Sequence, residues 1–177
     1  MQKLVIATGN QGKLLELQTL LQDLPIELIT QKSLGISDAD ETGLTFVENA
    51  LIKARHAATI SGLPALADDS GLCVPILGGA PGIYSARHAG EHGNDAANNQ
   101  KLLKELQTQQ NRKARFVTVL TVLIHEKRFI FEGEVTGTIA FEGRGTNGFG
   151  YDPLFVPTGY RSTFAQLSSE EKNKISH

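Results

Sequence analysis

The segment with the clearest chemical meaning is a short polar stretch between an expected strand and an expected helix. It reads Thr8-Gly9-Asn10-Gln11-Gly12-Lys13. Backbone N–H groups at the start of a helix have no partner within the helix, so they can bind a phosphate. Lys13 would lie in the first turn, where the helix dipole disfavours a cation unless an anion is bound nearby. We therefore interpret the stretch as a phosphate cradle; the alternative is an ordinary Asn10 cap with a solvated lysine.

Three carboxylates form the second group with chemical potential. Asp68 and Asp69 follow a short apolar strand expected at residues 65–67, and Glu41 lies in a polar loop before the second expected helix. Oxygen ligands of this kind suit Mg²⁺. Neighbouring strand residues point to opposite faces, so we expect Asp69 to enter the site, where it could hold a metal or accept a proton from water. The alternative is that the run from Asp68 to Gly71 merely begins a turn.

A glycine-rich loop near the C-terminus combines two aromatic residues with a carboxylate. It reads Thr146-Asn147-Gly148-Phe149-Gly150-Tyr151-Asp152-Pro153. An aromatic ring can stack on a nucleobase and an acceptor can read its edge. The alternative is a hairpin exit whose aromatic rings belong to the core. Lys53, Arg87 and Lys172 could clamp phosphate oxygens, although such residues usually lie on the solvated surface.

Three familiar motifs can be rejected. Residues 143–148 fit the dinucleotide pattern G-x-G-x-x-G, but Pro153 follows instead of a helix. Residues 88–92 fit a zinc pattern that requires a helix, which Gly90 disfavours. The stretch that ends at Lys13 has too few residues between its glycines for a phosphate-binding P-loop.

The elements that must position these groups alternate between strand and helix in the first part of the chain. The expected strands are residues 3–7, 65–67, 115–125 and 128–141, and the expected helices begin at Asn10, Thr45 and Asn98. Leucines at 14, 17, 20, 21 and 24 recur at helical spacing, and Thr45 with Glu48 forms a capping box. Early β-α alternation followed by a hairpin predicts an α/β fold, with a mixed sheet flanked by helices.

Length, charge and hydrophobic content limit the classes of protein to which this chain can belong. The chain has 177 residues, 40% of them hydrophobic, which favours one domain spanning residues 1–177. A net charge of -2 gives no general attraction for nucleic acid or anionic lipid, and no apolar stretch is long enough to span a bilayer. We therefore expect no nucleic-acid or membrane partner and a cytoplasmic location. The single cysteine, Cys73, is interpreted as structural.

Taken together, the motifs resemble the inosine/xanthosine triphosphate pyrophosphatase family, and its bacterial members in particular. The resemblance runs through nearly the whole chain. Its blocks, in family order, are Thr8-Gly9-Asn10 with Lys13, Glu41-Thr42-Gly43 with Thr45-Phe46 and Glu48-Asn49-Ala50, Ala67-Asp68-Asp69-Ser70-Gly71, Gly79-Ala80-Pro81-Gly82 with Ser85-Ala86-Arg87, and Gly148-Phe149-Gly150-Tyr151-Asp152-Pro153. Each block alone is weak, whereas five in order are specific.

The resemblance implies an elongated mixed sheet with two lobes and a nucleotide cleft between them, Mg²⁺ as cofactor and a homodimer. It implies catalytic roles for Asp69, Lys13 and Lys53, with Glu41 and Asp69 holding the metal. The implied substrate-binding residues are Thr8, Gly9, Asn10, Gln11, Gly12, Lys13, Ser70, Phe149, Gly150, Tyr151, Asp152, Lys172 and His177. Family members usually continue past His177 with an arginine and a further helix, which we expect to be absent here.

The implied reaction converts ITP, dITP or XTP to the monophosphate and pyrophosphate, through attack of water on the α-phosphorus. No covalent nucleophile is needed, and the residues suggest none. Two other functions remain open at this point. One is a nucleotide-binding protein without turnover, and the other is a Maf-like pyrophosphatase with a different base preference. A DNA-binding module is disfavoured because the chain has no basic stripe.

Overall fold

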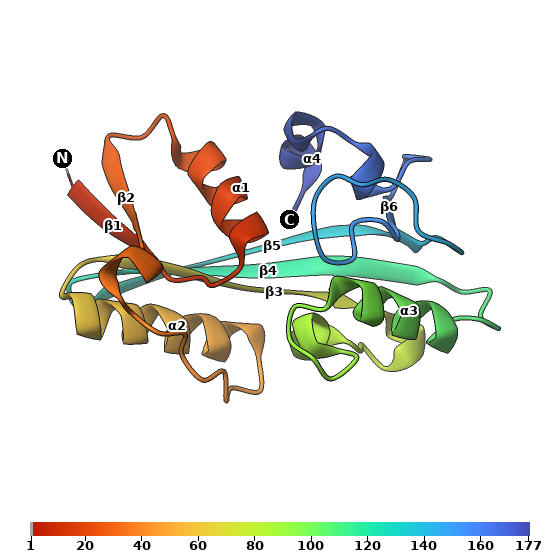
Figure 1. Cartoon of the computed structure of the whole chain (residues 1–177), viewed down its shortest axis with the longest axis horizontal. Helices are drawn as coiled ribbons and strands as arrows, with labels where there is room; N and C mark the ends of the chain where they lie inside the picture. The colour runs from red at the N-terminus through yellow and green to blue at the C-terminus, as the bar shows by residue number, and fades with distance from the viewer. Residues whose placement is uncertain (1) are drawn as a thin grey trace. The chain divides into compact units, whose positions relative to one another are not determined.

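A computed structural model describes residues 2–177, and Figure 1 shows its helices and strands. The strands are β1 (Gln2–Ile6), β2 (Ile26–Thr30), β3 (Ala65–Cys73), β4 (Lys113–Ile124), β5 (Lys127–Ile139) and β6 (Phe155–Pro157). The α-helices are α1 (Gln11–Leu21), α2 (Phe46–Ser61), α3 (Asp95–Glu105) and α4 (Ser169–Ile175). Short 3-10 helices lie at Lys32–Leu34, Pro75–Leu77, Gly82–Arg87 and Phe164–Gln166.

The six strands form one sheet in the order β2-β1-β3-β4-β5-β6. Strand β1 runs parallel to both β2 and β3, whereas β5 and β6 are antiparallel, so the sheet is mixed. The predicted fold class, a mixed sheet flanked by helices, is therefore confirmed. No helix among residues 2–177 combines the length and the apolar character that crossing a membrane requires.

The predicted starts of the first two helices are confirmed, whereas the predicted end of the first helix and the predicted start of the third are wrong. The Asn10 side chain caps α1 by accepting from the Lys13 N–H at 3.0 Å, and Thr45 caps α2 through the Glu48 N–H at 3.1 Å. Helix α1 ends at Leu21, so the prediction that Leu24 continues it is wrong. The third helix starts earlier than expected, because Asn94 rather than a later residue supplies the cap.

The expected break after residue 67 is also wrong. Strand β3 continues to Cys73, and Asp68, Asp69 and Gly71 are all buried within it. The physical reason is position: β3 lies in the interior of the sheet next to β4, and β1 pairs with its first residues, Ala65 and Leu66. Pairing in the sheet outweighs the local preference of residues 68–71 for a turn.

By their contacts, the residues divide into two compact units. One contains the chain up to Asp69 together with Thr118–Glu132, and the other contains Ser70–Val117 with Gly133–His177. In the first unit, α1 and α2 cover opposite faces of the sheet (Figure 1). Alternate residues of β1 pack on opposite faces of the sheet. One cluster contains Leu4, Ile6, Leu17 and Leu66. The other contains Val5, Ala7, Ala54, Ala57, Ala65 and Ala67.

The second unit has a larger aromatic core. Phe155 packs against Phe116 and Phe164, with ring centroids 4.6 and 5.2 Å apart. Leu102 of α3 and Leu106, which directly follows this helix, belong to the same cluster, and both are fully buried. Offset and tilted aromatic pairs of this kind add to the stabilisation that comes from burial alone.

The cap of α2 gives a first prediction. Thr45→Ala removes the acceptor for the Glu48 N–H, so the free energy of unfolding should fall by about 1 kcal/mol. Thr45→Ser keeps the hydroxyl and serves as the matched control, with a loss well below that of the alanine variant. Urea denaturation followed by circular dichroism measures both. Equal losses in the two variants would mean that the hydroxyl is not the stabilising group.

Candidate active site

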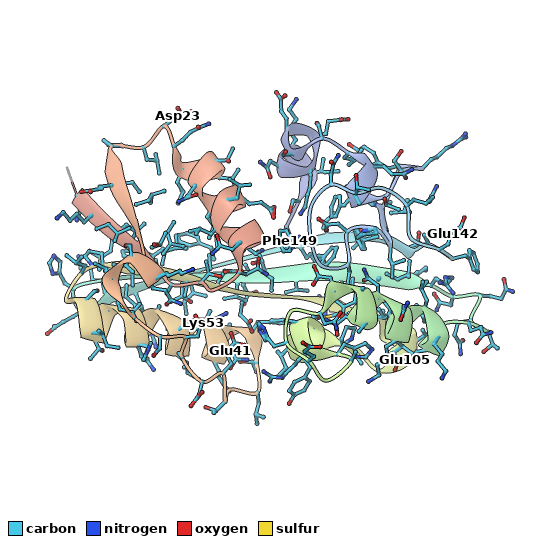
Figure 2. All side chains as sticks on the ribbon, viewed as in Figure 1. Asp23, Glu41, Lys53, Glu105, Glu142 and Phe149 are labelled. Carbon is cyan, nitrogen blue, oxygen red and sulfur yellow. The ribbon has the colours of Figure 1, made fainter. Side chains whose placement is uncertain are left out.

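A lysine between two carboxylates forms the centre of the polar cluster in the first unit. Lys53 Nζ lies 2.9 Å from Glu41 Oε1 and 3.5 Å from Asp69 Oδ1. Figure 2 shows Lys53 on α2 and Glu41 in the loop that precedes this helix. The side chains of Lys53 and Asp69 are 17% and 8% exposed, so this cluster is poorly screened by solvent.

The loop that carries Glu41 is held by the first turns of α2. The Gly43 N–H donates to Asn49 Oδ1 at 2.8 Å, and the Leu44 N–H donates to Glu48 Oε2 at 2.6 Å. A Cβ on Gly43 would lie 2.7 Å from Asn49 Oδ1, so a larger residue would displace the loop. Fully buried Asn49 thus couples the position of Glu41 to the helix that presents Lys53.

Burial governs the protonation of this cluster. Burial raises the pKa of Asp69 from 3.8 to about 6, helped by the nearby carboxylates of Glu41 and Asp68 and opposed by Lys53. Burial also penalises the charged form of Lys53, yet the pKa of Lys53 is raised overall because Asp68, Asp69 and Glu41 surround it. The lysine therefore stays charged while Asp69 titrates near neutrality.

The neighbouring carboxylate faces the other helix. Lys13 Nζ of α1 lies 3.5 Å from Asp68 Oδ2, whereas Lys53 of α2 contacts Asp69. The prediction that Asp68 and Asp69 point to opposite faces of the sheet is thus confirmed. The structure brings Lys13 to Asp68, and brings Glu41 and Lys53 to Asp69.

The loop before α1 is closely packed at Gly9. Thr8 Oγ1 accepts from the Asn10 N–H at 3.1 Å, which fixes the turn into the helix. A Cβ on Gly9 would lie 2.7 Å from Asp38 Oδ2, and Asp38 in turn accepts from Gln31 Nε2 at 2.5 Å. The sequence analysis did not identify Asp38 or Gln31 as neighbours of this loop, because no pattern links them to it in sequence.

A second polar cluster lies in the second unit, around Asp152. Asp152 Oδ2 accepts from the Phe149 N–H at 3.1 Å and from Lys172 Nζ at 2.7 Å, and both charged side chains are almost fully buried. Lys172 Nζ also lies 4.5 Å from the centroid of the Phe149 ring. Gly148 has a φ of 72°, and a Cβ there would collide with the Asp152 carboxylate, so this position requires glycine.

Helix α3 holds the same loop from its other side. Asp95 Oδ2 accepts from the Gly150 N–H at 2.9 Å, and Asn99 Nδ2 donates to the Gly150 carbonyl at 3.1 Å. Asp95 and Asn99 are one helical turn apart, so residues on one face of the helix hydrogen-bond both the N–H and the carbonyl of Gly150. The sequence analysis missed both residues, since their spacing occurs on any helix.

Several residues that were predicted to bind the substrate or its phosphates make contacts with other side chains and main-chain groups of the protein. The Tyr151 ring lies in the core, its hydroxyl donates to the Ser85 carbonyl at 2.7 Å, and burial raises its pKa. Its ring therefore anchors the loop in the core. The His177 ring stacks on Phe116 at 4.9 Å, and Arg87 lies over the Tyr84 ring. Ser70, which directly follows Asp69, is half-buried.

Comparison with known proteins decides the family. The model of the Ham1 family matches residues 4–177. The chain belongs to the Ham1 family. It is 56% identical to a dITP/XTP pyrophosphatase of Haemophilus influenzae, covering 99% of this chain and 93% of that protein. It is 52% identical to the dITP/XTP pyrophosphatase of Escherichia coli O157:H7, covering 100% and 92%.

Solved structures of Ham1 proteins agree with this assignment. The chain matches a HAM1 protein from Coxiella burnetii with a TM-score of 0.91 and 47% identity, covering 100% of this chain and 92% of that one. The Ham1 protein of Staphylococcus aureus gives a TM-score of 0.87 and 43% identity, with 99% and 92% covered. The resemblance inferred from the five motif blocks is therefore confirmed.

The carboxylates of this Ham1-family chain fit a magnesium ion. Asp69 Oδ2 is buried and has no hydrogen-bond partner among residues 2–177, a costly state that a cation would relieve. Among the described residues, no three His, Cys, Asp or Glu side chains gather as a complete metal site. Mg²⁺ is usually held by one or two carboxylates, with water and substrate phosphates completing its octahedron. Glu41 and Asp69 are the two carboxylates that flank Lys53.

The raised pKa of Asp69 gives a second prediction. In the unfolded chain Asp69 ionises near 3.8, whereas in the fold it ionises near 6, so its stability contribution is full below pH 3.8 and is lost as the pH rises through 6. Without added Mg²⁺, Asp69→Asn should therefore gain stability relative to the parent by roughly 2 to 3 kcal/mol between pH 4 and pH 8. Urea denaturation at both pH values tests this. A pH-independent difference would contradict the assigned titration.

Proposed function

We propose that this chain hydrolyses deaminated purine nucleoside triphosphates, ITP, dITP and XTP, to the monophosphate and pyrophosphate, and so removes them from the nucleotide pool. Membership of the Ham1 family and the similarity to two dITP/XTP pyrophosphatases support this activity. The observation within the molecule that carries it is Lys53 between Glu41 and buried Asp69. A cation, a metal-competent carboxylate pair and a near-neutral base are what this hydrolysis needs.

Asp69 is the proposed general base. Its raised pKa leaves it ionised at physiological pH, yet basic enough to take a proton from the attacking water. The water oxygen bonds to the α-phosphorus, the bond from that phosphorus to the bridging oxygen breaks, and pyrophosphate leaves. Glu41 and Asp69 would hold Mg²⁺, which when bound offsets negative charge on the phosphate oxygens.

The remaining cations of the first unit are assigned to the triphosphate. Lys13 lies in the first turn of α1, beside the N–H groups that the Thr8–Lys13 segment offers to an anion. Lys53 stays protonated because Asp68, Asp69 and Glu41 raise its pKa, so it can offset charge on a phosphate oxygen as the reaction proceeds. Ser70 is assigned a contact with the substrate through its position next to Asp69.

The second unit is assigned to the base. The Phe149 ring would stack on the purine, and Gly150, Asp152, Lys172 and His177 would surround it. The Lys172 ammonium can only donate hydrogen bonds. The 6-oxo group of a deaminated purine can accept one, whereas the 6-amino group of adenine is itself a donor. Tyr151 contributes through its backbone and by anchoring the loop in the core.

We also propose that the protein is a cytoplasmic homodimer. The cytoplasm is the compartment in which nucleic-acid precursors are made and used, so a pool-cleaning hydrolase acts there. The homodimer follows from the family resemblance.

A substrate panel tests the activity. Pyrophosphate release should be selective for ITP, dITP and XTP over ATP and GTP, should need Mg²⁺ and should stop with EDTA. Asp69→Asn should lower kcat by at least about a hundredfold while leaving the circular dichroism spectrum unchanged. Binding without release in the parent would favour a nucleotide-binding protein, and a preference for pyrimidine or modified nucleotides would favour a Maf-like pyrophosphatase.

The phosphate cradle gives a separate prediction. Lys13→Ala should weaken ITP binding by roughly tenfold while changing IMP binding little, because its partner is the triphosphate. Lys104→Ala, which removes an exposed lysine from α3, is the matched control and should change neither affinity. Isothermal titration with Mg²⁺ measures both ligands. Parent protein with equal affinity for ITP and IMP would rule out this role for the segment.

A further inference from the structure

Gly150 is an adaptable position in the loop that carries Phe149 and Asp152. Its φ of 61° lies in the left-handed region, and a Cβ on it would meet no atom within 4 Å apart from its chain neighbours. Glycine changes conformation more readily than any other residue, and it has no side chain that could anchor it in the core. The two peptide groups of Gly150 therefore need partners outside the loop to keep one orientation.

The rest of the loop is held without Gly150. The Phe149 N–H donates to Asp152 Oδ2 at 3.1 Å, and the Asp152 N–H donates to the Phe149 carbonyl at 3.1 Å. The Tyr151 ring lies in the core, and Asp152 pairs with Lys172. These contacts keep the loop on the second unit even when the Gly150 peptide groups move. The hydrogen bonds of Gly150 are thus not needed to keep the loop attached.

Helix α3 supplies partners for both polar groups of Gly150. Asp95 Oδ2 accepts from its N–H at 2.9 Å, and Asn99 Nδ2 donates to its carbonyl at 3.1 Å. The first bond orients the peptide group that follows Phe149, and the second orients the peptide group that precedes Tyr151. The two bonds together remove the freedom that glycine would otherwise have at this position. Helix α3 consequently sets the orientation of the loop beside the Phe149 ring.

The surroundings of Asn99 indicate a role other than stability. Asparagine is a poor helix former, and Asn99 Oδ1 is buried with no hydrogen-bond partner among residues 2–177. A buried acceptor without a partner costs about 1–3 kcal/mol. An apolar residue would avoid this cost, but it could not donate to the Gly150 carbonyl. The asparagine is therefore explained by its donor rather than by the packing of the helix.

Helix α3 is itself firmly held, so it can support the loop. Asn98 uses both ends of its amide: Nδ2 donates to the Ala86 carbonyl at 3.0 Å, and Oδ1 accepts from the Ala89 N–H at 2.8 Å. Leu102, one turn further along the helix, is fully buried. The helix, its partners and the loop all belong to the second unit. These contacts restrain the helix at the residues that meet the loop.

We propose that Asp95 and Asn99 are positioning residues for base recognition. They hold the peptide groups of Gly150 so that the Phe149 ring and the Asp152 carboxylate meet the purine together. The proposal rests on the base-binding role proposed for this loop. Contacts that are equally strong in the ground state and the transition state change KM and leave kcat nearly unchanged. Loss of either residue should therefore weaken base binding and base selectivity rather than the chemical step.

Two substitutions on opposite sides of Gly150 test the proposal. Asp95→Ala removes the acceptor, and Asn99→Asp removes the donor with almost no change of shape. Each should raise KM for ITP and the dissociation constant of IMP roughly tenfold, with kcat changed less than about twofold. The value of kcat/KM for ATP, whose base the loop does not favour, should change less than about twofold. The selectivity for ITP over ATP should therefore fall roughly tenfold.

Two control variants separate positioning from stability. Asp95→Asn keeps an acceptor and should restore most of the parent selectivity. Gln100→Glu adds the same charge as Asn99→Asp at an exposed position of α3 and should change neither selectivity nor IMP affinity. A purely structural role would instead lower kcat/KM equally for ITP and ATP together with the urea midpoint, and this result would overturn the proposal.

Binding of IMP separates the proposal from the hydrolytic activity. Unchanged IMP affinity in both Asp95→Ala and Asn99→Asp would overturn the positioning role, even in an active enzyme. A parent that binds IMP but releases no pyrophosphate from ITP would remove the proposed hydrolysis, and a roughly tenfold loss of IMP affinity in the two variants would still support the positioning role. A parent that binds neither nucleotide would overturn both.

Discussion

The burial of the Asp69 carboxylate in a central strand is the constraint on which the first unit depends. A buried carboxylate is costly unless it is compensated, and Lys53 supplies the compensation from α2. The helix must therefore start where Thr45 caps it, so that Lys53 falls opposite β3. The loop that carries Glu41 depends on the same helix through Asn49. The position at which α2 begins therefore determines where both Lys53 and the Glu41 loop lie relative to Asp69.

The pair Asp68 and Asp69 extends this constraint to both faces of the sheet. Because neighbouring strand residues alternate, two adjacent carboxylates require a cation on each side, and α1 and α2 supply Lys13 and Lys53. The strand thus fixes the position of both lysines that we assign to the triphosphate. The two charges of the strand are thus each paired with a lysine from one of the two helices.

Sequence reasoning succeeded where the signal is local. Asn10 and Thr45 act through residues three positions away, so their helix starts could be predicted. It failed at Asp68–Gly71, where pairing within the sheet beside β4 decides the conformation. Sequence reasoning also could not tell that the Tyr151 ring lies in the core while the Phe149 ring is half-buried, and it did not find Asp95. Contacts between residues far apart in the sequence determine all three positions.

The two buried ion pairs differ in one respect that separates their roles. In the second unit, Asp152 Oδ2 accepts two hydrogen bonds, from Lys172 Nζ and from the Phe149 N–H. This carboxylate therefore fixes the position of the Lys172 ammonium and of the loop at Phe149. In the first unit, Asp69 Oδ2 has no hydrogen-bond partner within residues 2–177, although it is buried. A satisfied carboxylate has little to gain from a cation, whereas an unsatisfied one has much. On this difference we base the proposed roles of Asp152 in base recognition and of Asp69 in metal binding.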